Sequence, residues 1–146
     1  VSGDTSAGGL TRLEWSLASN PDAVILELGA NDGLRGINPS TTKTNLARIL
    51  GQLRLRDIPV LFAGMLAPPN LGREYGFKFN QTYQDLAKEF DVVFYPFFLD
   101  GVAGVPELNQ LDGIHPTGKG IAKIVMKIKP YVKKLVSKIK TSKSDS

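Results

Sequence analysis

Residues 24–33 read Val-Ile-Leu-Glu-Leu-Gly-Ala-Asn-Asp-Gly, a short apolar run that ends in turn-forming residues. Runs of about four to eight apolar residues bounded by such turns are typical of buried strands. Two later stretches follow the same pattern: residues 59–65 (Pro-Val-Leu-Phe-Ala-Gly-Met) and residues 92–98 (Val-Val-Phe-Tyr-Pro-Phe-Phe). We therefore predict buried strands at 24–30, 59–65 and 92–98, with Pro96 weakening the far end of the third.

Helical periodicity fills the segments around these strands. Apolar residues recur at spacings of three and four in four places: at Leu10, Leu13 and Leu17; at Leu46, Ile49, Leu50 and Leu53; from Tyr75 to Phe90; and from Ile121 to Ile139. Ser40, Thr41 or Thr42 is the predicted N-cap of the second helix, and Thr117 is that of the last. Pro130 should kink the last helix because proline lacks a backbone N–H.

The resulting order is helix, strand, helix, strand, helix, strand, loop, helix. Such alternation indicates an α/β fold with parallel strands, right-handed crossovers and helices on both faces of the sheet. Functional sites of these folds gather at the carboxyl ends of the strands. The residues just after 30, 65 and 98 are therefore the first places to look for chemistry.

Length and composition narrow the function classes. The 146 residues predict a single domain, residues 1–146, and 42% hydrophobic with 22% charged residues is ordinary for a globular chain. No apolar run reaches the roughly 18 residues of a membrane-spanning helix. The chain has no cysteine and one histidine, which excludes disulfides, thiolate catalysis and a multi-histidine zinc site. We expect no metal and no cofactor.

The net charge of +4 comes from one terminal segment. Residues 1–116 hold nine basic and thirteen acidic side chains, whereas residues 117–146 hold nine lysines and one aspartate. This division argues against a nucleic-acid partner. A solvated helix face is the main interpretation of the lysines, and weak contact with anionic lipid is the alternative. A salt dependence of activity on charged substrates would separate the two.

Three short motifs could carry chemistry. In Asp112-Gly-Ile-His115, the carboxylate can accept a hydrogen bond from the imidazole Nδ1 and leave Nε2 as a general base, although so short a motif also arises by chance. Asn31 follows a strand, where its amide could bind an oxyanion or merely form a turn. The backbone N–H of Gly3 could bind an anion ahead of a helix, unless residues 2–5 are a plain capped loop.

The order of these motifs resembles that of the SGNH hydrolases, also called the GDSL esterases and lipases. The resemblance extends along nearly the whole chain and is strongest to the bacterial arylesterase, thioesterase and lysophospholipase group. The stretches that carry it are Ser-Gly-Asp-Thr-Ser-Ala-Gly-Gly-Leu-Thr-Arg-Leu (2–13), Leu-Glu-Leu-Gly-Ala-Asn-Asp-Gly-Leu-Arg-Gly (26–36), Pro-Pro-Asn-Leu-Gly-Arg-Glu-Tyr (68–75), Tyr-Gln-Asp-Leu-Ala-Lys-Glu-Phe (83–90) and Leu-Asp-Gly-Ile-His-Pro-Thr (111–117).

The resemblance implies a flavodoxin-like three-layer α/β/α fold and a role for each motif. His115 would be the general base, Asp112 its orienting partner, and Gly3 and Asn31 the oxyanion hole. Residues of two loops would bind a small-molecule ester or thioester: Leu34, Arg35, Ile37, Pro69, Asn70 and Tyr75. We interpret Asp32 as a turn or supporting residue. Each loop could also be an ordinary connection.

The sequence departs from the family at the nucleophile. The family's Gly-Asp-Ser-Leu block at the end of the first strand is absent, and Gly-Asp-Thr-Ser (3–6) imitates it without a preceding buried strand. We expect a chain that lacks its first strand or strands, with the serine upstream. Ser2 or Ser6 as the nucleophile is the alternative.

Two functions therefore remain open. The first is a serine esterase that hydrolyses aryl esters, short-to-medium acyl esters or lysophospholipids through an acyl-enzyme. The second is a non-catalytic acyl- or carbohydrate-binding module on the same fold. The resemblance implies a bacterial periplasmic or secreted protein, with the cytoplasm as the alternative. The sequence does not define an oligomeric state.

Overall fold

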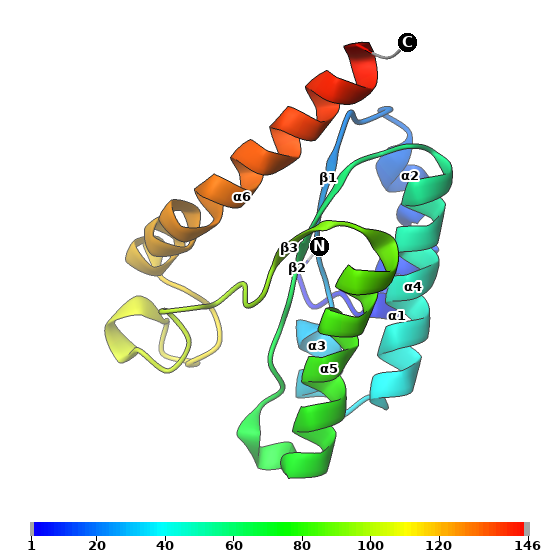
Figure 1. Cartoon of the computed structure of the whole chain (residues 1–146). Coiled ribbons are helices and arrows are strands. Elements are labelled where there is room, and N and C mark those ends of the chain that lie inside the picture. Colours follow the sequence, from blue (N-terminus) through cyan, green and yellow to red (C-terminus); the bar gives the residue numbers. More distant parts are fainter. Residues whose placement is uncertain (1, 145–146) are drawn as a thin grey trace.

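A computed structural model describes residues 2–144, with side chains up to residue 139. The chain forms an α/β fold in which short strands alternate with helices (Figure 1). The elements are α1 (Ser6–Thr11), α2 (Leu13–Leu17), β1 (Val24–Glu27), α3 (Ala30–Leu34), α4 (Pro39–Leu55), β2 (Val60–Ala63), η1 (Pro69–Leu71), α5 (Arg73–Phe90), β3 (Val93–Tyr95), η2 (Pro106–Leu108) and α6 (Gly118–Ser144).

The three predicted strands are all present and are shorter than expected at their carboxyl ends. They form one parallel sheet in the order β1-β2-β3, with Ile25 beside Leu61 and Leu61 beside Val93. The residues predicted to end each strand instead form the loops that carry the site. The third strand stops before Pro96, which cannot donate a ladder hydrogen bond.

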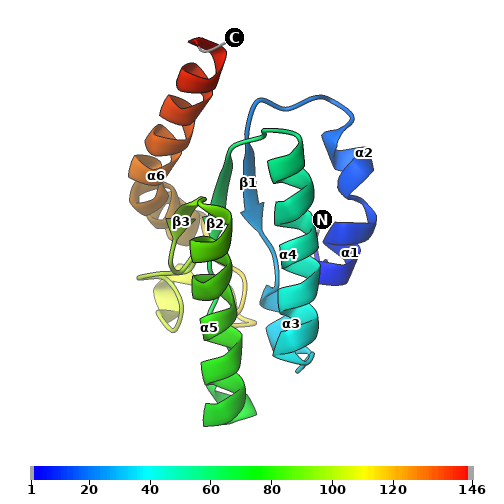
Figure 2. The same ribbon diagram turned by 45° about the vertical axis from the view of Figure 1, so that its right-hand side comes forward.

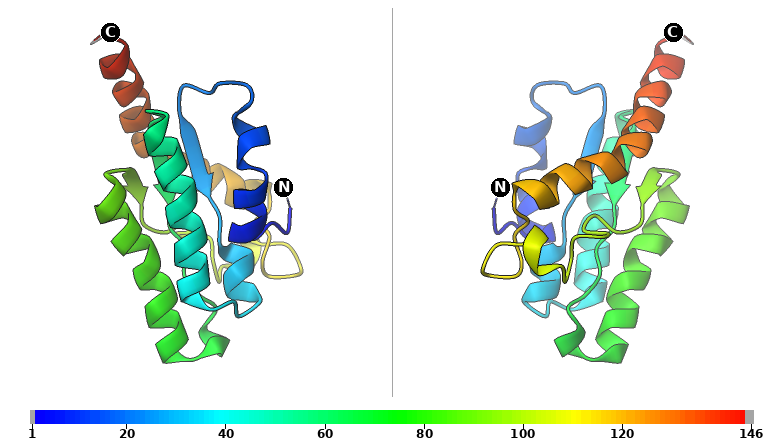
Figure 3. Two further views of the ribbon diagram at one scale, coloured as in Figure 1. Left: turned by 90° about the vertical axis from the view of Figure 1, so that its right-hand side faces the viewer. Right: turned by 90° about the vertical axis from the view of Figure 1, so that its left-hand side faces the viewer.

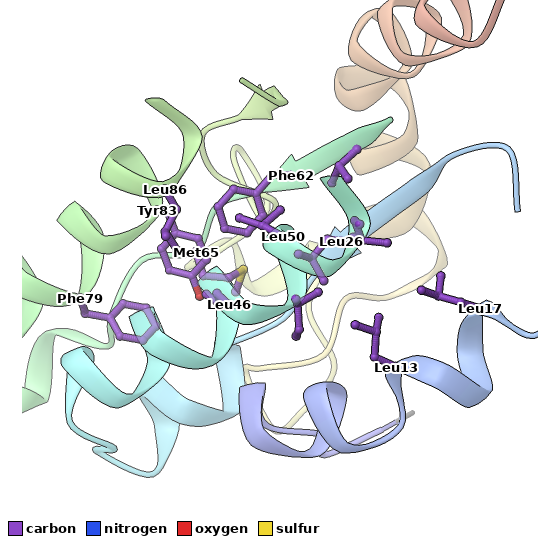
Figure 4. Close-up of a cluster of buried hydrophobic side chains, with 13 residues drawn as sticks. Leu13, Leu17, Leu26, Leu46, Leu50, Phe62, Met65, Phe79, Tyr83 and Leu86 are labelled. Atoms are coloured by element: carbon purple, nitrogen blue, oxygen red, sulfur yellow. The ribbon is translucent and has the colours of Figure 1, made fainter. Parts of the chain in front are cut away.

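Helices cover both faces of the sheet and make three layers (Figures 2 and 3). One core cluster joins β1 and β2 to α2, α4 and α5; its buried side chains include Leu26, Phe62, Leu50 and Tyr83 (Figure 4). A smaller cluster on the other face joins Leu61, Val93 and Tyr95 to Ile128 and Leu135 of α6. The alternation of strand residues between the two clusters confirms the predicted three-layer α/β/α architecture.

Two local predictions about helices are wrong. The N-cap of α4 is Asn38, whose side chain accepts from Ser40 N, and not Ser40, Thr41 or Thr42. Pro39 occupies the first helical turn, where its missing N–H costs nothing, so the cap must precede it. The first predicted helix is divided at Arg12 into α1 and α2.

The long last helix behaves as predicted. Gly120 N donates to Thr117 Oγ1, which confirms the cap at Thr117. Pro130 lies inside α6, and the helix axis bends near its middle (Figure 3, right). Within residues 2–144 we find no helix with both the length and the apolar composition that a bilayer crossing requires.

One face of β1 is open. Ile25 points to the same face as Leu61 and Val93, yet it is 52% exposed because α6 packs mainly on β2 and β3. The outer edge of β1 has no strand partner among the described residues. Unpaired apolar edges are unfavourable in water, since their backbone N–H and C=O groups invite pairing.

Candidate active site

His115 and Asp112 form a hydrogen-bonded pair in the loop that leads into α6. Asp112 Oδ2 lies 2.7 Å from His115 Nδ1. The loop is closed by the hydrogen bond from Gln110 N to His115 O (2.8 Å), and by that from Thr117 N to Leu108 O (2.9 Å). The His115 side chain is 61% exposed, so its ring is accessible from solvent. With Nδ1 bonded to the carboxylate, Nε2 is the nitrogen available to accept a proton.

Local backbone geometry holds the Asp112 carboxylate in its charged form. The N–H of His115, the imidazole of His115 and the N–H of Ile114 all bond to it, and together they lower the pKa of Asp112 to about 2. Hydrogen bonds to the charged form stabilise that form. The carboxylate is therefore ionised wherever an esterase works and can stabilise an imidazolium cation beside it.

Asn31 lies in the first turn of α3, not in the turn after a longer strand that the sequence predicts. The chain leaves β1 at Glu27 and turns at Gly29, whose φ of +104° is left-handed. A Cβ at Gly29 would lie 2.0 Å from Tyr83 Oη, which itself donates to Leu28 O. Only glycine fits this close approach, and the turn brings Asn31 to the carboxyl edge of the sheet.

The loop at residues 2–5, which we call the glycine loop, lies against Asn31. Asn31 Nδ2 donates to Asp4 O at 2.9 Å, and Arg35 Nη2 donates to Gly3 O at 3.2 Å. Gly3 itself has a φ of +76°, a left-handed conformation that favours glycine. The two residues predicted for the oxyanion hole thus belong to neighbouring segments, although they are 28 positions apart in the sequence.

An apolar cleft of about 510 Å³ lies between α3 and the loop at residues 109–117, which we call the histidine loop. Of the six predicted substrate-binding residues it is lined by Leu34 and Pro69, and Gly113 and Ile114 from the histidine loop lie on its other side. Sequence reasoning missed the remaining apolar lining, which follows β2 and β3: Met65, Leu66, Ala67, Phe97, Leu99 and Ala103. Their positions just after strand ends were the available signal.

The other predicted substrate residues lie elsewhere. Arg35 holds the glycine loop, Asn70 is exposed in η1, and Ile37 accepts a hydrogen bond from Tyr75 Oη at 2.7 Å. Burial and the nearby Asp32 raise the pKa of Tyr75, so the phenol keeps its proton and donates it. Tyr75 therefore fastens the loop after α3 to α5.

We expect Tyr75→Phe to loosen this loop without removing the ring from the core. Loss of one hydrogen bond should lower the free energy of unfolding by about 1 kcal/mol. Leu34, which directly precedes this loop, lines the cleft, so KM should rise more than kcat falls. Urea unfolding and steady-state kinetics of the full-length protein measure both quantities. An unchanged unfolding free energy would contradict the role of Tyr75.

The two serine alternatives differ in their surroundings. Ser2 is exposed, whereas Ser6 is buried. The Ser6 hydroxyl donates to Asp32 Oδ2 and accepts from Asn45 Nδ2. Its one proton is thus donated to Asp32, which competes with donation to a histidine. Among the described residues no group of three or more metal-ligating side chains is close enough to hold an ion.

A His–Asp pair and an amide donor at the carboxyl edge of a parallel sheet form the kind of site at which hydrolases on α/β sheets use a serine, an aspartate and a histidine. The chain belongs to the GDSL-like lipase/acylhydrolase family, whose model matches residues 1–123. This confirms the family that the sequence motifs indicate.

Named relatives are enzymes. The chain is 42% identical to Esterase TesA of Pseudomonas aeruginosa over 93% of this chain and 68% of that protein. It is 44% identical to Thioesterase 1/protease 1/lysophospholipase L1 of Escherichia coli, over 80% of this chain and 56% of that protein. An arylesterase of Vibrio mimicus is 40% identical over 80% of this chain and 58% of its own length. The chain thus spans little more than half of the last two relatives.

Solved structures of esterases have the same fold as this chain. The crystal structure of TesA superposes with a TM-score of 0.86 at 42% identity, over 92% of this chain and 75% of that one. A psychrotrophic esterase EstA from Pseudoalteromonas sp., inhibited by monoethylphosphonate, superposes with a TM-score of 0.87 at 31% identity, over 93% and 75%. These likenesses confirm the fold, and the enzyme names favour a hydrolase over a binding module.

Proposed function

We propose that the full-length protein is a serine esterase that hydrolyses carboxylic esters or thioesters through an acyl-enzyme. The observation that carries the proposal is the 2.7 Å hydrogen bond between His115 Nδ1 and Asp112 Oδ2, beside an apolar cleft, in a member of the family. A binding module would need neither a free imidazole Nε2 nor an ionised partner.

Each candidate site residue of this chain then has its own role in the reaction. His115 Nε2 takes the proton of the serine as the hydroxyl attacks the acyl carbon, and afterwards returns it to the leaving alcohol or thiol. Asp112 keeps the imidazole oriented and stabilises its cation. The oxygen that becomes negative is bound by the serine N–H, Gly3 N–H and the Asn31 amide. Water, activated by His115, releases the acid.

The open edge of β1 supports a serine carried by a further strand. That edge lacks a partner within the described residues, and Ile25 next to it is apolar and half-exposed. A parallel strand paired there would end at the same edge of the sheet as Asn31 and the histidine loop. A serine at its carboxyl end would face both.

The cleft indicates the substrate class. Its lining of leucine, proline, phenylalanine and isoleucine side chains favours an apolar acyl or aryl group. Aryl esters, short-to-medium acyl esters and lysophospholipids all present such a group next to the scissile bond. The small-molecule ester is the partner that we propose, without a cofactor.

Most of the described lysines of α6 are exposed, which supports the solvated-face interpretation. Two of them also contact segments outside the helix: Lys127 pairs with Asp100, and Lys138 donates to Asp91 O. Lys134 lies over the ring of Tyr131 within α6. Contact with anionic lipid and export to the periplasm stay predictions that rest on charge and resemblance.

A fluorophosphonate probe tests the proposed function, because it labels only a serine that a base has activated. The full-length protein should be labelled once per chain and should hydrolyse a p-nitrophenyl ester. Mass spectrometry of the labelled peptide identifies the serine. Absence of both labelling and hydrolysis would refute the esterase, and labelling of Ser2 or Ser6 would refute the serine on a further strand.

The low pKa of Asp112 predicts how pH acts on its role. Its carboxylate is charged above about pH 2, so its help to His115 is present across the working range and is lost only as pH falls through that value. We expect Asp112→Asn to lower kcat/KM by about 100-fold or more. The ratio of wild type to variant should be the same at about pH 8 and pH 9, above the range in which imidazoles titrate. A ratio that changes between these two pH values would contradict the prediction.

A further inference from the structure

Asp32 is a buried carboxylate that neither the histidine pair nor the cleft explains. It is 1% exposed and accepts three hydrogen bonds: at Oδ1 from Ser6 N (2.7 Å), and at Oδ2 from Ser6 Oγ (2.5 Å) and Thr42 Oγ1 (2.9 Å). The ion pairs of the described residues do not include it. Burying a carboxylate without a cation is costly unless neutral donors satisfy it fully.

These donors join the start of α1 to α3. Ser6 opens α1 only three residues after Gly3, and Asp32 directly follows Asn31 in α3. The same two segments are joined again by Asn31 Nδ2 to Asp4 O and by Arg35 Nη2 to Gly3 O. The two bonds that Ser6 donates to Asp32 are the buried part of this junction, since Arg35 is exposed.

A third element, α4, also bonds to this junction. Thr42 of α4 donates to Asp32, and Asn45 of α4 donates to Ser6 Oγ at 3.0 Å. Asp32, Ser6, Thr42 and Asn45 form what we call the Asp32 network. Satisfied polar networks of this kind are rigid, because any shift leaves a buried group without its partner.

We infer that Asp32 is a positioning residue that fixes the separation between Gly3 N–H and the Asn31 side-chain amide in the oxyanion hole. The inference rests on the proposed function. The amide of Asn31 has two hydrogens; one is donated to Asp4 O, and the other is available for the oxyanion. Such donors act only within about 2.7–3.1 Å of the developing charge, so a small shift of either segment weakens both.

The test is Asp32→Asn in the full-length protein. The amide has the shape of the carboxylate but offers N–H groups toward the donors Ser6 and Thr42, so the junction must shift. We expect kcat to fall by about 10- to 100-fold, part of what removal of a whole oxyanion donor costs, while KM stays within about threefold. Affinity for a trifluoromethyl ketone, whose serine adduct is a tetrahedral anion, should fall in proportion to kcat.

A destabilised control separates positioning from stability. Leu86 is fully buried on α5 in the core, and Leu86→Ala leaves a cavity there. At a temperature where every variant is folded, Leu86→Ala should have a lower thermal midpoint with unchanged kcat and inhibitor affinity. If Asp32→Asn does not fold, Ser6→Ala replaces it, with an expected loss of about 3- to 10-fold in both quantities.

Several outcomes overturn the inference. The first is a kcat within about threefold of wild type in Asp32→Asn, or in Ser6→Ala where that variant replaces it. The second is an effect of the substitution on KM alone. The third is a loss of kcat with unchanged inhibitor affinity. An equal loss in Leu86→Ala reduces Asp32 to a structural residue. An inactive wild-type protein refutes the proposed function and this inference with it. An active wild type with an unaffected variant refutes the inference alone.

Discussion

His115→Ala is expected to lower kcat of the full-length protein by about 10⁴-fold or more and to abolish fluorophosphonate labelling. His115 is the single histidine of the chain, and its Nδ1 is already bonded to Asp112. Without the imidazole, the remaining carboxylate of Asp112, whose pKa is lowered to about 2, is too weak a base to take the proton of the serine. Stopped-time ester hydrolysis and in-gel fluorescence of the probe measure the two losses.

Leu111→Ala is the matched control for His115→Ala. Leu111 is fully exposed in the same loop and next to Asp112, so its truncation perturbs the loop without touching the imidazole. Activity within about twofold of wild type is expected, because surface substitutions rarely cost much. If His115→Ala kept more than about a tenth of wild-type activity, another residue would be the general base.

Asn31→Ala is expected to lower kcat by about 10²- to 10³-fold, or about 2.7–4 kcal/mol of transition-state stabilisation. The amide binds charge that exists only in the transition state, so KM should change little. The variant also loses the bond from Asn31 Nδ2 to Asp4 O. A lower thermal midpoint is therefore expected as well, and steady-state kinetics must be measured below it.

Asn38→Ala controls for the loss of stability in Asn31→Ala. Asn38 caps α4 through its side-chain oxygen, a contact typically worth about 1 kcal/mol, and it lies outside the cleft. It should destabilise the fold and leave kcat near wild type. A kcat for Asn31→Ala within about threefold of wild type would remove Asn31 from the oxyanion hole.

The local pattern of apolar residues was sufficient to locate the helices and strands, but not the residues at which they end. Apolar runs located all three strands, yet each strand ends two or three residues early. At β1 the reason is Gly29, where the approach of Tyr83 from α5 imposes a left-handed turn. That contact joins residues far apart in the sequence. The cap of α4 was missed because Asn38 precedes a proline, and the nearby serine and threonines match the cap preference equally well.

The site was predictable where its partners are close in sequence. The hydrogen bond between Asp112 and His115 spans three residues, so the turn alone allows it. The apolar lining of the cleft comes from the ends of different strands, and only Leu34 and Pro69 were anticipated. Tyr75 was predicted to bind the substrate, and in the structure its hydroxyl donates a hydrogen bond to Ile37 O.

The sequence by itself determined the α/β class and the family, and it singled out His115, Asp112 and Asn31 as candidate site residues, because periodicity and short motifs are local properties. The tertiary structure alone decided which side chains meet: the Asp32 network, the glycine loop against Asn31, and the cleft between α3 and the histidine loop. The contacts of the Asp32 network join residues 10 to 39 positions apart, and the cleft joins residues as far apart as Ala30 and Ile114, so only the packing of helices on a parallel sheet can bring them together.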